Sequence, residues 1–351
     1  MPTPTLNPPT ETSEAPPVQD FKGNQVATKD PITEKPSPSP NSPPSREDLE
    51  AAILKMGPDA WLELAGTVWA QTHEAPTLVI WLRDSDIILR ETAEEVFKAL
   101  QGLTTPVPKL WVILNSLGGS LDGAYHIARH LQRTAQRVYV VIPRMAKSAA
   151  TLITLGCHEV IMHPMAELGP IDTQIDIVRD DVVKTLSTLD ALKSLEYLSE
   201  YAITNFVNVT TGLRGNNKRL TTRAASSIAA SVTRGLVDPL FAQINPIQLG
   251  EVFRALDLSR EYGKRLVQVS YPHLSSDQQT ALVKTLAESY PAHGFVIDLK
   301  EAESLSLNVR ATNPQERGIV DAGVNFGAGK ARSVKLYVPA PEQPAQKAEG
   351  T

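Results

Sequence analysis

A continuously apolar run, Leu110–Leu114, followed by a double-glycine turn constrains the fold more than any other feature of this sequence. Such a run, without alternating polar positions, is typical of a strand buried on both faces of a parallel sheet. Beyond Gly118 and Gly119, the apolar residues of 121–131 recur on one helical face, and a second apolar run follows at Val138–Ile142. The segment therefore reads as a β-α-β unit, and it predicts an α/β fold.

Changes in composition predict how the chain is divided. Residues 1–46 are rich in Pro and Ser and almost lack large apolar side chains, so they are expected to form a disordered tail. The other expected parts are a helical lead-in at 47–75, broken at Gly57-Pro58; an α/β core at 76–210, closed by a long helix from Asp181 to about Val209; a mostly helical C-terminal extension at 211–335; and a flexible tail at 336–351.

Charge, cysteine content and hydropathy exclude several classes of protein. The formal net charge is -5, whereas binding to nucleic-acid phosphates needs clustered positive charge, so no nucleic-acid partner is expected. The single cysteine, Cys157, cannot form an intramolecular disulfide and is expected to be a buried thiol. Because no apolar run reaches about 18 residues and residues 1–20 lack the pattern of a secretory signal, we expect a cytoplasmic protein without a membrane span.

A second feature stands at the corresponding end of the next β-α unit. Ser148 opens a helix of small residues that ends at Gly156. Because the carboxyl ends of neighbouring parallel strands lie together, this serine and the double-glycine turn are expected to meet. An acyl-transfer enzyme needs such a nucleophile beside N–H donors, each worth about 3 to 4 kcal/mol to the oxyanion, and the candidate donors are in Gly118, Gly119 and Ala149.

Each of these signals has an ordinary structural alternative. A serine at a helix start is most often a capping residue, and a Gly-Gly turn is usually only a turn. The loop lacks the Gly-Lys-Ser/Thr ending of a phosphate-binding loop and the third glycine of a dinucleotide motif, so no nucleotide cofactor is expected. His126 and His130 lie four residues apart, but no third ligand can be named, so no metal site is expected.

Four ordered motifs carry a resemblance to a known family: Asn115–Gly119, Ala124–Ala128, Ala146–Leu152 and Leu168–Gln174. Together they resemble the serine dehydrogenase proteinase family, a branch of the Clp protease and signal-peptide peptidase A group with the crotonase-like fold. The resemblance covers about 77–175 and, more loosely, Tyr290–Asp298. It implies a ClpP/crotonase-like β-α-β superhelix with additional C-terminal helices and a serine peptidase without a cofactor. In that peptidase the nucleophile would be the serine, and the Gly-Gly turn would supply oxyanion donors.

The chain departs from the family pattern at two places. Leu117 stands where the family usually has proline, which is expected to loosen the oxyanion loop, and Cys157-His158 replaces a usual Ala-Asp pair. Neither change removes the nucleophile.

The sequence alone leaves the general base open among several candidates. Asp172 lies where the Clp proteases carry their catalytic histidine, and His293 lies where relatives also tend to have histidine. Lys184 or Lys193 would instead make a Ser-Lys dyad like that of the signal-peptide peptidase relatives, which requires a lysine pKa lowered from about 10.4 towards about 7. Each candidate also has a structural alternative as a turn aspartate, a loop-pinning histidine or a solvated lysine. Lys147 is discounted, because neighbouring side chains at a helix start point apart.

These patterns together favour a serine peptidase that acts on a peptide or protein substrate through a Ser148 acyl-enzyme. Relatives in this group assemble into oligomers, so the long helix is expected to pack between subunits of a homo-oligomer. Two alternatives stay open. One is a catalytically inactive relative that binds peptides or scaffolds a partner, and the other is a crotonase-type enzyme acting on coenzyme A thioesters.

Overall fold

The structure of this chain, a computed structural model, describes residues 57–104, 106–172, 174–179, 182–325 and 330–340. The predicted tail at 1–46 and the first part of the lead-in therefore lie outside the described residues. Among the helices within the described ranges, none is long and apolar enough to cross a lipid bilayer.

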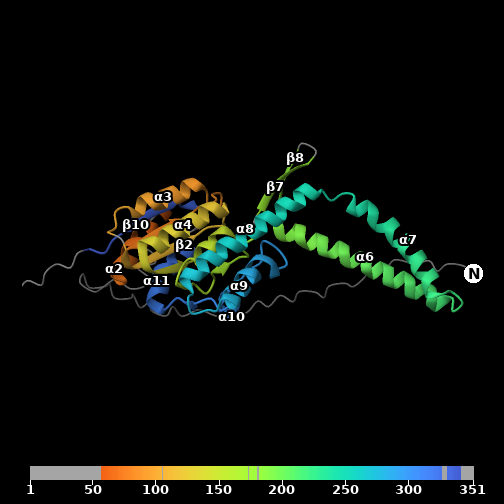
Figure 1. The fold of residues 1–351 in the computed structure, drawn as a ribbon. Helices are drawn as coiled ribbons and strands as arrows, with labels where there is room; N and C mark the ends of the chain where they lie inside the picture. The colour runs from red at the N-terminus through yellow and green to blue at the C-terminus, as the bar shows by residue number, and fades with distance from the viewer. Residues whose placement is uncertain (1–56, 105, 173, 180–181, 326–329, 341–351) are drawn as a thin grey trace, which may run out of the picture. The chain divides into compact units, whose positions relative to one another are not determined.

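A six-stranded sheet organises the described chain (Figure 1). Its strand order is β10-β1-β2-β3-β5-β9, and every neighbouring pair is parallel except β10 with β1. The predicted α/β fold with a parallel sheet is thereby confirmed. In chain order the strands are β1 (Thr77–Trp81), β2 (Val107–Asn115), β3 (Ala135–Ile142), β5 (Glu159–Met162), β9 (Val309–Ala311) and β10 (Ser333–Tyr337).

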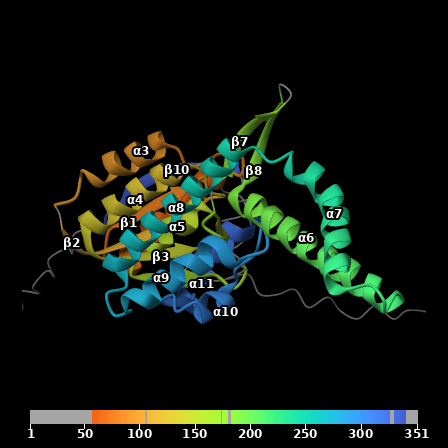
Figure 2. The same cartoon turned by 45° about the vertical axis from the view of Figure 1, so that its right-hand side comes forward.

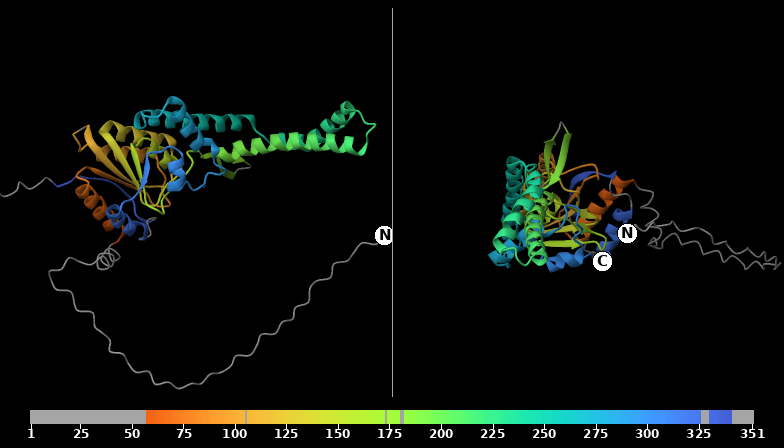
Figure 3. Two further views of the ribbon diagram at one scale, coloured as in Figure 1. Left: turned by 90° about the horizontal axis from the view of Figure 1, so that it is seen from below. Right: turned by 90° about the vertical axis from the view of Figure 1, so that its right-hand side faces the viewer.

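Helices pack on both faces of this sheet (Figures 2 and 3). On one face lie α3 (Arg90–Leu100), α4 (Leu121–Thr134), α5 (Ala149–Leu155) and α8 (Pro246–Ser270), and on the other lie α2 (Pro58–Thr72) and α11 (Pro314–Asn325). Both faces of the central strands are therefore shielded from water, which is why β2 tolerates no polar residue between Leu110 and Leu114.

The sheet separates two apolar cores, and successive side chains of a strand alternate between them. In β2, Leu110 and Val112 belong to the core beneath α3 and α4, whereas Trp111 belongs to the core beneath α2. Cys157 is fully buried in the first of these cores, as expected, and burial raises the pKa of its thiol. Such a thiol is a packing residue, not a reactive one.

The remaining elements lie between the sheet strands along the chain: β4 lies between β3 and β5, and the others lie between β5 and β9. They are β4 (Met145–Ala146), paired with β6 (Glu167–Leu168); the hairpin of β7 (Gln174–Arg179) and β8 (Val182–Ser187); α6 (Thr188–Asn216) and α7 (Thr222–Phe241), which lie side by side; α9 (Ser276–Lys284), continued by the π-helical turn η1 (Thr285–Ser289); and α10 (Leu299–Ser304) (Figure 1).

The predicted start of the long helix is wrong. Helix α6 begins at Thr188, not at Asp181, because Val182–Ser187 forms β8 and pairs with β7. The β-branched residues of this segment favour a strand. The hydroxyl of Ser187 then accepts hydrogen bonds from two first-turn N–H groups, which fixes the helix start.

The C-terminal part contains two strands that the sequence did not predict. They are β9 and β10, and they complete the two opposite edges of the main sheet. Strand β10 includes Leu336 and Tyr337, which the sequence assigned to a flexible tail. With three and five residues, these strands are too short to show a clear alternation of apolar and polar positions.

Candidate functional site

Ser148 lies in a sharp turn between β4 and α5. Its backbone has φ 49° and ψ -117°, a conformation that costs a non-glycine residue of order 1–3 kcal/mol. The side chain is 8% exposed and does not cap the helix that follows. Instead, Oγ donates a hydrogen bond to the backbone carbonyl oxygen of Asp172, with an oxygen–oxygen distance of 3.1 Å. Helix capping therefore does not account for this serine.

The double-glycine turn lies against this serine. Gly118 and Gly119 have φ values of 106° and 140°, which residues with a Cβ atom rarely adopt. A Cβ atom on Gly118 would lie 3.0 Å from Cβ of Ser148 and 3.2 Å from the amide nitrogen of Ala149. Gly119 packs on the backbone of Ile88, where no side chain fits either. The turn, the serine and the first amide of α5 thus lie together.

Two backbone N–H groups at this point have no acceptor within the described part of the chain, those of Gly119 and Ala149. The N–H of Gly118 differs, because it donates to Oγ of Ser116 at 3.1 Å. Unpaired N–H donors beside a nucleophile are what a developing oxyanion requires. Gly119 and Ala149 are therefore the candidate donors whose N–H groups are available, and Gly118 leaves the adjoining space free of a side chain.

Asp172 and His293 form the second half of the site. Nδ1 of His293 lies 2.5 Å from Oδ1 of Asp172, and Oγ of Ser187 donates to Oδ2 of the same carboxylate at 2.5 Å. Asp172 is fully buried, in the irregular segment before β7, whereas the His293 side chain is 24% exposed. The hydrogen bond with Asp172 raises the pKa of His293, and burial opposes this effect. An imidazole held by a buried carboxylate is the arrangement of a general base and its orienting acid.

Ser148 and His293 do not hydrogen-bond to each other in this structure. Both contact Asp172, the serine through the backbone carbonyl and the histidine through the carboxylate. Direct proton transfer from the hydroxyl to the imidazole therefore requires the serine side chain to leave the carbonyl. In enzymes without substrate such hydrogen bonds are often long, and they form when substrate binds.

The lysines considered as partners of the serine do not contact it. Lys193 pairs with Glu196 on the surface of α6, at 2.8 Å. The side chain of Lys184 lies outside the described residues. Lys147 is half-buried beside the site, but its ammonium group binds backbone carbonyls of other segments. Of the candidates for the base whose side chains are described, His293 is the one that hydrogen-bonds to Asp172, the residue whose backbone carbonyl also accepts the hydrogen bond of the serine hydroxyl.

Ser187 escaped the sequence analysis, and Lys147 was considered there only as a base and discounted. Ser187 caps α6 and also binds the carboxylate of Asp172. Its signal is the serine with an aspartate three residues later, a helix-start pattern that the misplaced helix boundary hid. Lys147 contacts segments that are distant along the chain, and a local pattern carries no information on such contacts.

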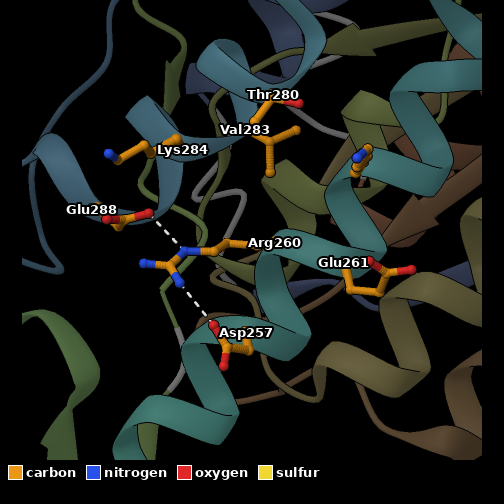
Figure 4. Close-up of a pocket in the computed structure, with 8 residues that line it drawn as sticks. Asp257, Arg260, Glu261, Thr280, Val283, Lys284 and Glu288 are labelled. Carbon is orange, nitrogen blue, oxygen red and sulfur yellow. Dashed lines mark hydrogen bonds and ion pairs between the residues drawn. The ribbon is translucent and has the colours of Figure 1, made fainter. Parts of the chain in front are cut away.

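A cavity of about 600 Å³ opens between α8 and the α9–η1 segment (Figure 4). Arg260 lies in it between Glu288 and Asp257, with nitrogen–oxygen distances of 2.6 and 2.7 Å. The other lining residues are Glu261, Lys264, Thr280, Val283 and Lys284. None of the candidate catalytic residues lines this cavity, and the guanidinium of Arg260 is already paired with two carboxylates. The cavity is therefore separate from the site.

Metal ligands do not gather in the described residues, where no group of three or more His, Cys, Asp and Glu side chains is placed to hold an ion. The rings of His126 and His130 are 6.4 Å apart between centroids, and His130 lies 5.0 Å from the ring of Phe97. These two histidines therefore belong to an aromatic surface cluster.

Comparisons with known proteins match part of this chain. The family model described as a ClpP-like SDH-type serine proteinase matches residues 85–237. Two uncharacterized proteins of Methanocaldococcus jannaschii are similar in sequence. MJ0137 is 33% identical over 130 residues, which is 37% of this chain and 45% of that protein. MJ1495 is 34% identical over 85 residues, which is 24% of this chain and 29% of that protein. The matched part is thus less than half of either relative.

Two solved structures also resemble this chain. A mutant of ClpP1 from Listeria monocytogenes has 15% sequence identity and a TM-score of 0.36, with 74% of this chain and 99% of that chain covered. A mutant of the 1510-N membrane-bound stomatin-specific protease has 14% identity and a TM-score of 0.25, with 40% and 63% covered. At these TM-scores neither likeness bears on what this chain does.

The range matched by the family model contains most of the site described above. Ser148, the double-glycine turn and Asp172 lie within it, and His293 lies beyond its end. Residues 85–237 of this chain are thus similar to the ClpP-like SDH-type serine proteinases described by that family model.

Proposed function

We propose that this chain is a serine peptidase that cleaves a peptide or protein substrate through an acyl-enzyme on Ser148. One observation carries the proposal: a strained serine lies beside two backbone N–H groups that have no acceptor in the described part of the chain. In the proposed reaction, Oγ of Ser148 attacks the carbonyl carbon. The N–H groups of Gly119 and Ala149 bind the oxygen that becomes negative, and each donor lowers the barrier by about 3 to 4 kcal/mol.

His293 is the proposed general base. It would take the proton of the hydroxyl and return it to the leaving amine, while Asp172 accepts the Nδ1–H hydrogen bond and fixes the tautomer. Only the neutral imidazole accepts a proton, and Asp172 raises the pKa of His293. Activity is therefore expected to increase with pH through a pKa above the ordinary histidine value of about 6.5.

A fluorophosphonate probe, which reacts with activated serines, tests this proposal. Wild-type protein should be labelled on Ser148, at a rate that increases with pH through the pKa of His293, and Ser148→Ala should not be labelled. If folded wild-type protein is not labelled, the peptidase proposal is wrong and a peptide-binding or scaffold role is favoured. Labelling that persists in Ser148→Ala would place the reactive group elsewhere. If an acyl-coenzyme A raised the melting temperature of the protein and peptides did not, a crotonase-type enzyme acting on coenzyme A thioesters would be favoured instead.

We also propose that the protein is a homo-oligomer assembled through α6 and α7. These helices expose large apolar side chains, including Tyr197, Ile203 and Val207 on α6 and Ile228 and Val232 on α7. Their exposed fractions are between 43% and 68%, whereas soluble monomers rarely expose contiguous apolar patches larger than a few hundred Å².

Light scattering should therefore return a mass well above that of one chain at micromolar concentration. Ile203→Lys combined with Val207→Lys should lower the mass toward the monomer, because two charges would enter an apolar contact. Lys98→Glu, a surface change on α3, is the control that should leave the mass unchanged. A wild-type protein that is monomeric at micromolar concentration would contradict the assembly.

A further inference from the structure

Lys147, the residue before the proposed nucleophile, is held by three oxygen atoms. Its Nζ lies 3.3 Å from the carbonyl oxygen of Leu168, 3.2 Å from that of Phe295 and 3.2 Å from Oε2 of Glu167. The side chain is 12% exposed, and that of Glu167 is 26% exposed. An ammonium group has three donors and no acceptor. Here it donates hydrogen bonds to the two backbone carbonyls and forms an ion pair with the carboxylate of Glu167.

The three acceptors belong to the two segments that carry the other candidate catalytic residues. Glu167 and Leu168 form β6, shortly before Asp172, and Phe295 follows His293 by two residues. The backbones of Leu168 and Ile297 exchange two hydrogen bonds, of 2.9 and 3.1 Å, at the same place. The ammonium group therefore lies where the Asp172 segment and the His293 loop meet.

The aliphatic stem of Lys147 is fitted as closely as its charged end. A Cβ atom on Gly169 would lie 2.9 Å from Cδ of Lys147, a distance that requires the side chain to move. Glycine at this position thus leaves the space that the lysine stem occupies. Packing of the stem and binding of the ammonium group together fix a single position for this side chain.

We propose that Lys147 is a positioning residue that fixes the His293 loop against the Asp172 segment and so places the imidazole for Ser148. This inference rests on the proposed peptidase function. One side chain, anchored in the turn of the nucleophile, joins all three parts of the site. Without it, the loop keeps its backbone bonds to β6 but loses its tie to the serine turn.

The charge of Lys147 also acts on His293. The charged groups that face this imidazole are Asp172 and Asp190, which raise its pKa, and Lys147, which lowers it. Neutralising the lysine should therefore raise the pKa of His293. The neutral, basic form would then require a higher pH, and the acid limb of the pH–rate profile should move upward.

Lys147→Met tests the proposal, because it keeps most of the stem and removes the charge and the donors. We expect a labelling rate with fluorophosphonate roughly 10-fold lower on the high-pH plateau, because the imidazole is misplaced, and an acid limb at higher pH. Lys335→Met is the matched control, since Lys335 also pairs with a carboxylate, that of Glu63, but on the exposed surface of β10. Lys335→Met should leave both the plateau labelling rate and the acid limb of the pH–rate profile unchanged.

A second variant decides the matter if Lys147→Met does not fold. Gly169→Ala keeps the lysine but displaces its stem. It should therefore lower the plateau labelling rate and move the acid limb of the pH–rate profile to higher pH, each by less than Lys147→Met does. The proposal would be overturned if folded Lys147→Met protein had the same plateau labelling rate as wild type and the same acid limb of its pH–rate profile. Loss of thermal stability alone, without a change in either property, would also overturn it, because the lysine would then be only structural.

The titration of His293 separates this inference from the proposed function. Its imidazole signal, assigned by comparison with His293→Gln, can be followed by NMR in proteins that show no labelling. A higher His293 pKa in Lys147→Met than in wild type would support the positioning role even if the peptidase proposal fails. If wild type is labelled but the His293 pKa is the same in Lys147→Met and in wild type, the positioning role is refuted and the peptidase proposal stays intact.

Discussion

Asp172→Asn should hydrolyse a peptide substrate about 10⁴-fold more slowly than wild type, the scale seen when the orienting acid of a catalytic triad loses its charge. The carboxylate of Asp172 has two donors directed at it, Nδ1–H of His293 and the hydroxyl of Ser187. An asparagine amide offers one acceptor oxygen and one NH₂ group. One of the two donors would then face another donor, and the imidazole would turn to the tautomer that cannot accept a proton at Nε2.

The measurement is kcat of the purified, folded variant, with circular dichroism melting as the check on folding. Asp190→Asn is the matched control, because Asp190 also raises the pKa of His293 but does not hydrogen-bond to it. We expect that control to change kcat by less than about threefold, since a pair at the surface contributes roughly 0–1 kcal/mol. A folded Asp172→Asn protein within tenfold of wild type would show that Asp172 does not orient the base.

Gly118→Ala should reduce the rate of fluorophosphonate labelling roughly 10²- to 10³-fold, the effect of losing one oxyanion donor. The added Cβ would lie 2.7 Å from the carbonyl oxygen of Lys147 and 3.0 Å from Cβ of Ser148. The backbone at this position also has φ 106°, which alanine adopts only with strain of order 1–3 kcal/mol. The turn must therefore move, and the N–H of Gly119 moves with it.

Gly102→Ala is the control for this change. Gly102 lies in a turn with no atom within 4 Å of an added Cβ, so neither labelling nor melting temperature should change appreciably. Gly118→Ala should lower the melting temperature only modestly while labelling almost disappears. Labelling of Gly118→Ala at the wild-type rate would mean that the double-glycine turn does not bind the oxyanion.

The parts of the fold that the sequence predicted are those with strong local patterns. The apolar run of β2, the helical stripe of α4 and the β-prone β3 each span enough residues for their period to be clear, and their order implies a parallel sheet. Strand β9 and the edge strand β10 are short and join the sheet only through contacts with distant segments. Their assignment depends on tertiary pairing, which a single sequence does not contain.

The same distinction holds for the site. Ser148 and the glycines are marked by residue type and position, since a serine opening a helix and a glycine pair after a strand are local features. The pairing of Asp172 with His293 joins residues 121 positions apart, and nothing local separates this histidine from a surface one. Ser187 was missed for a different reason, because a strand was read as the first turns of a helix.

The order in which the chain is made has a consequence for this site. The centre of the sheet and the turn of Ser148 come from the first half of the described chain, but the imidazole and both outer strands come from the last part. Such long-range closure is slow compared with helix formation. In the proposed peptidase, a chain still emerging from the ribosome would thus carry the hydroxyl of Ser148 without its base, and peptide cleavage would begin only after the His293 loop had been made and had folded against the sheet.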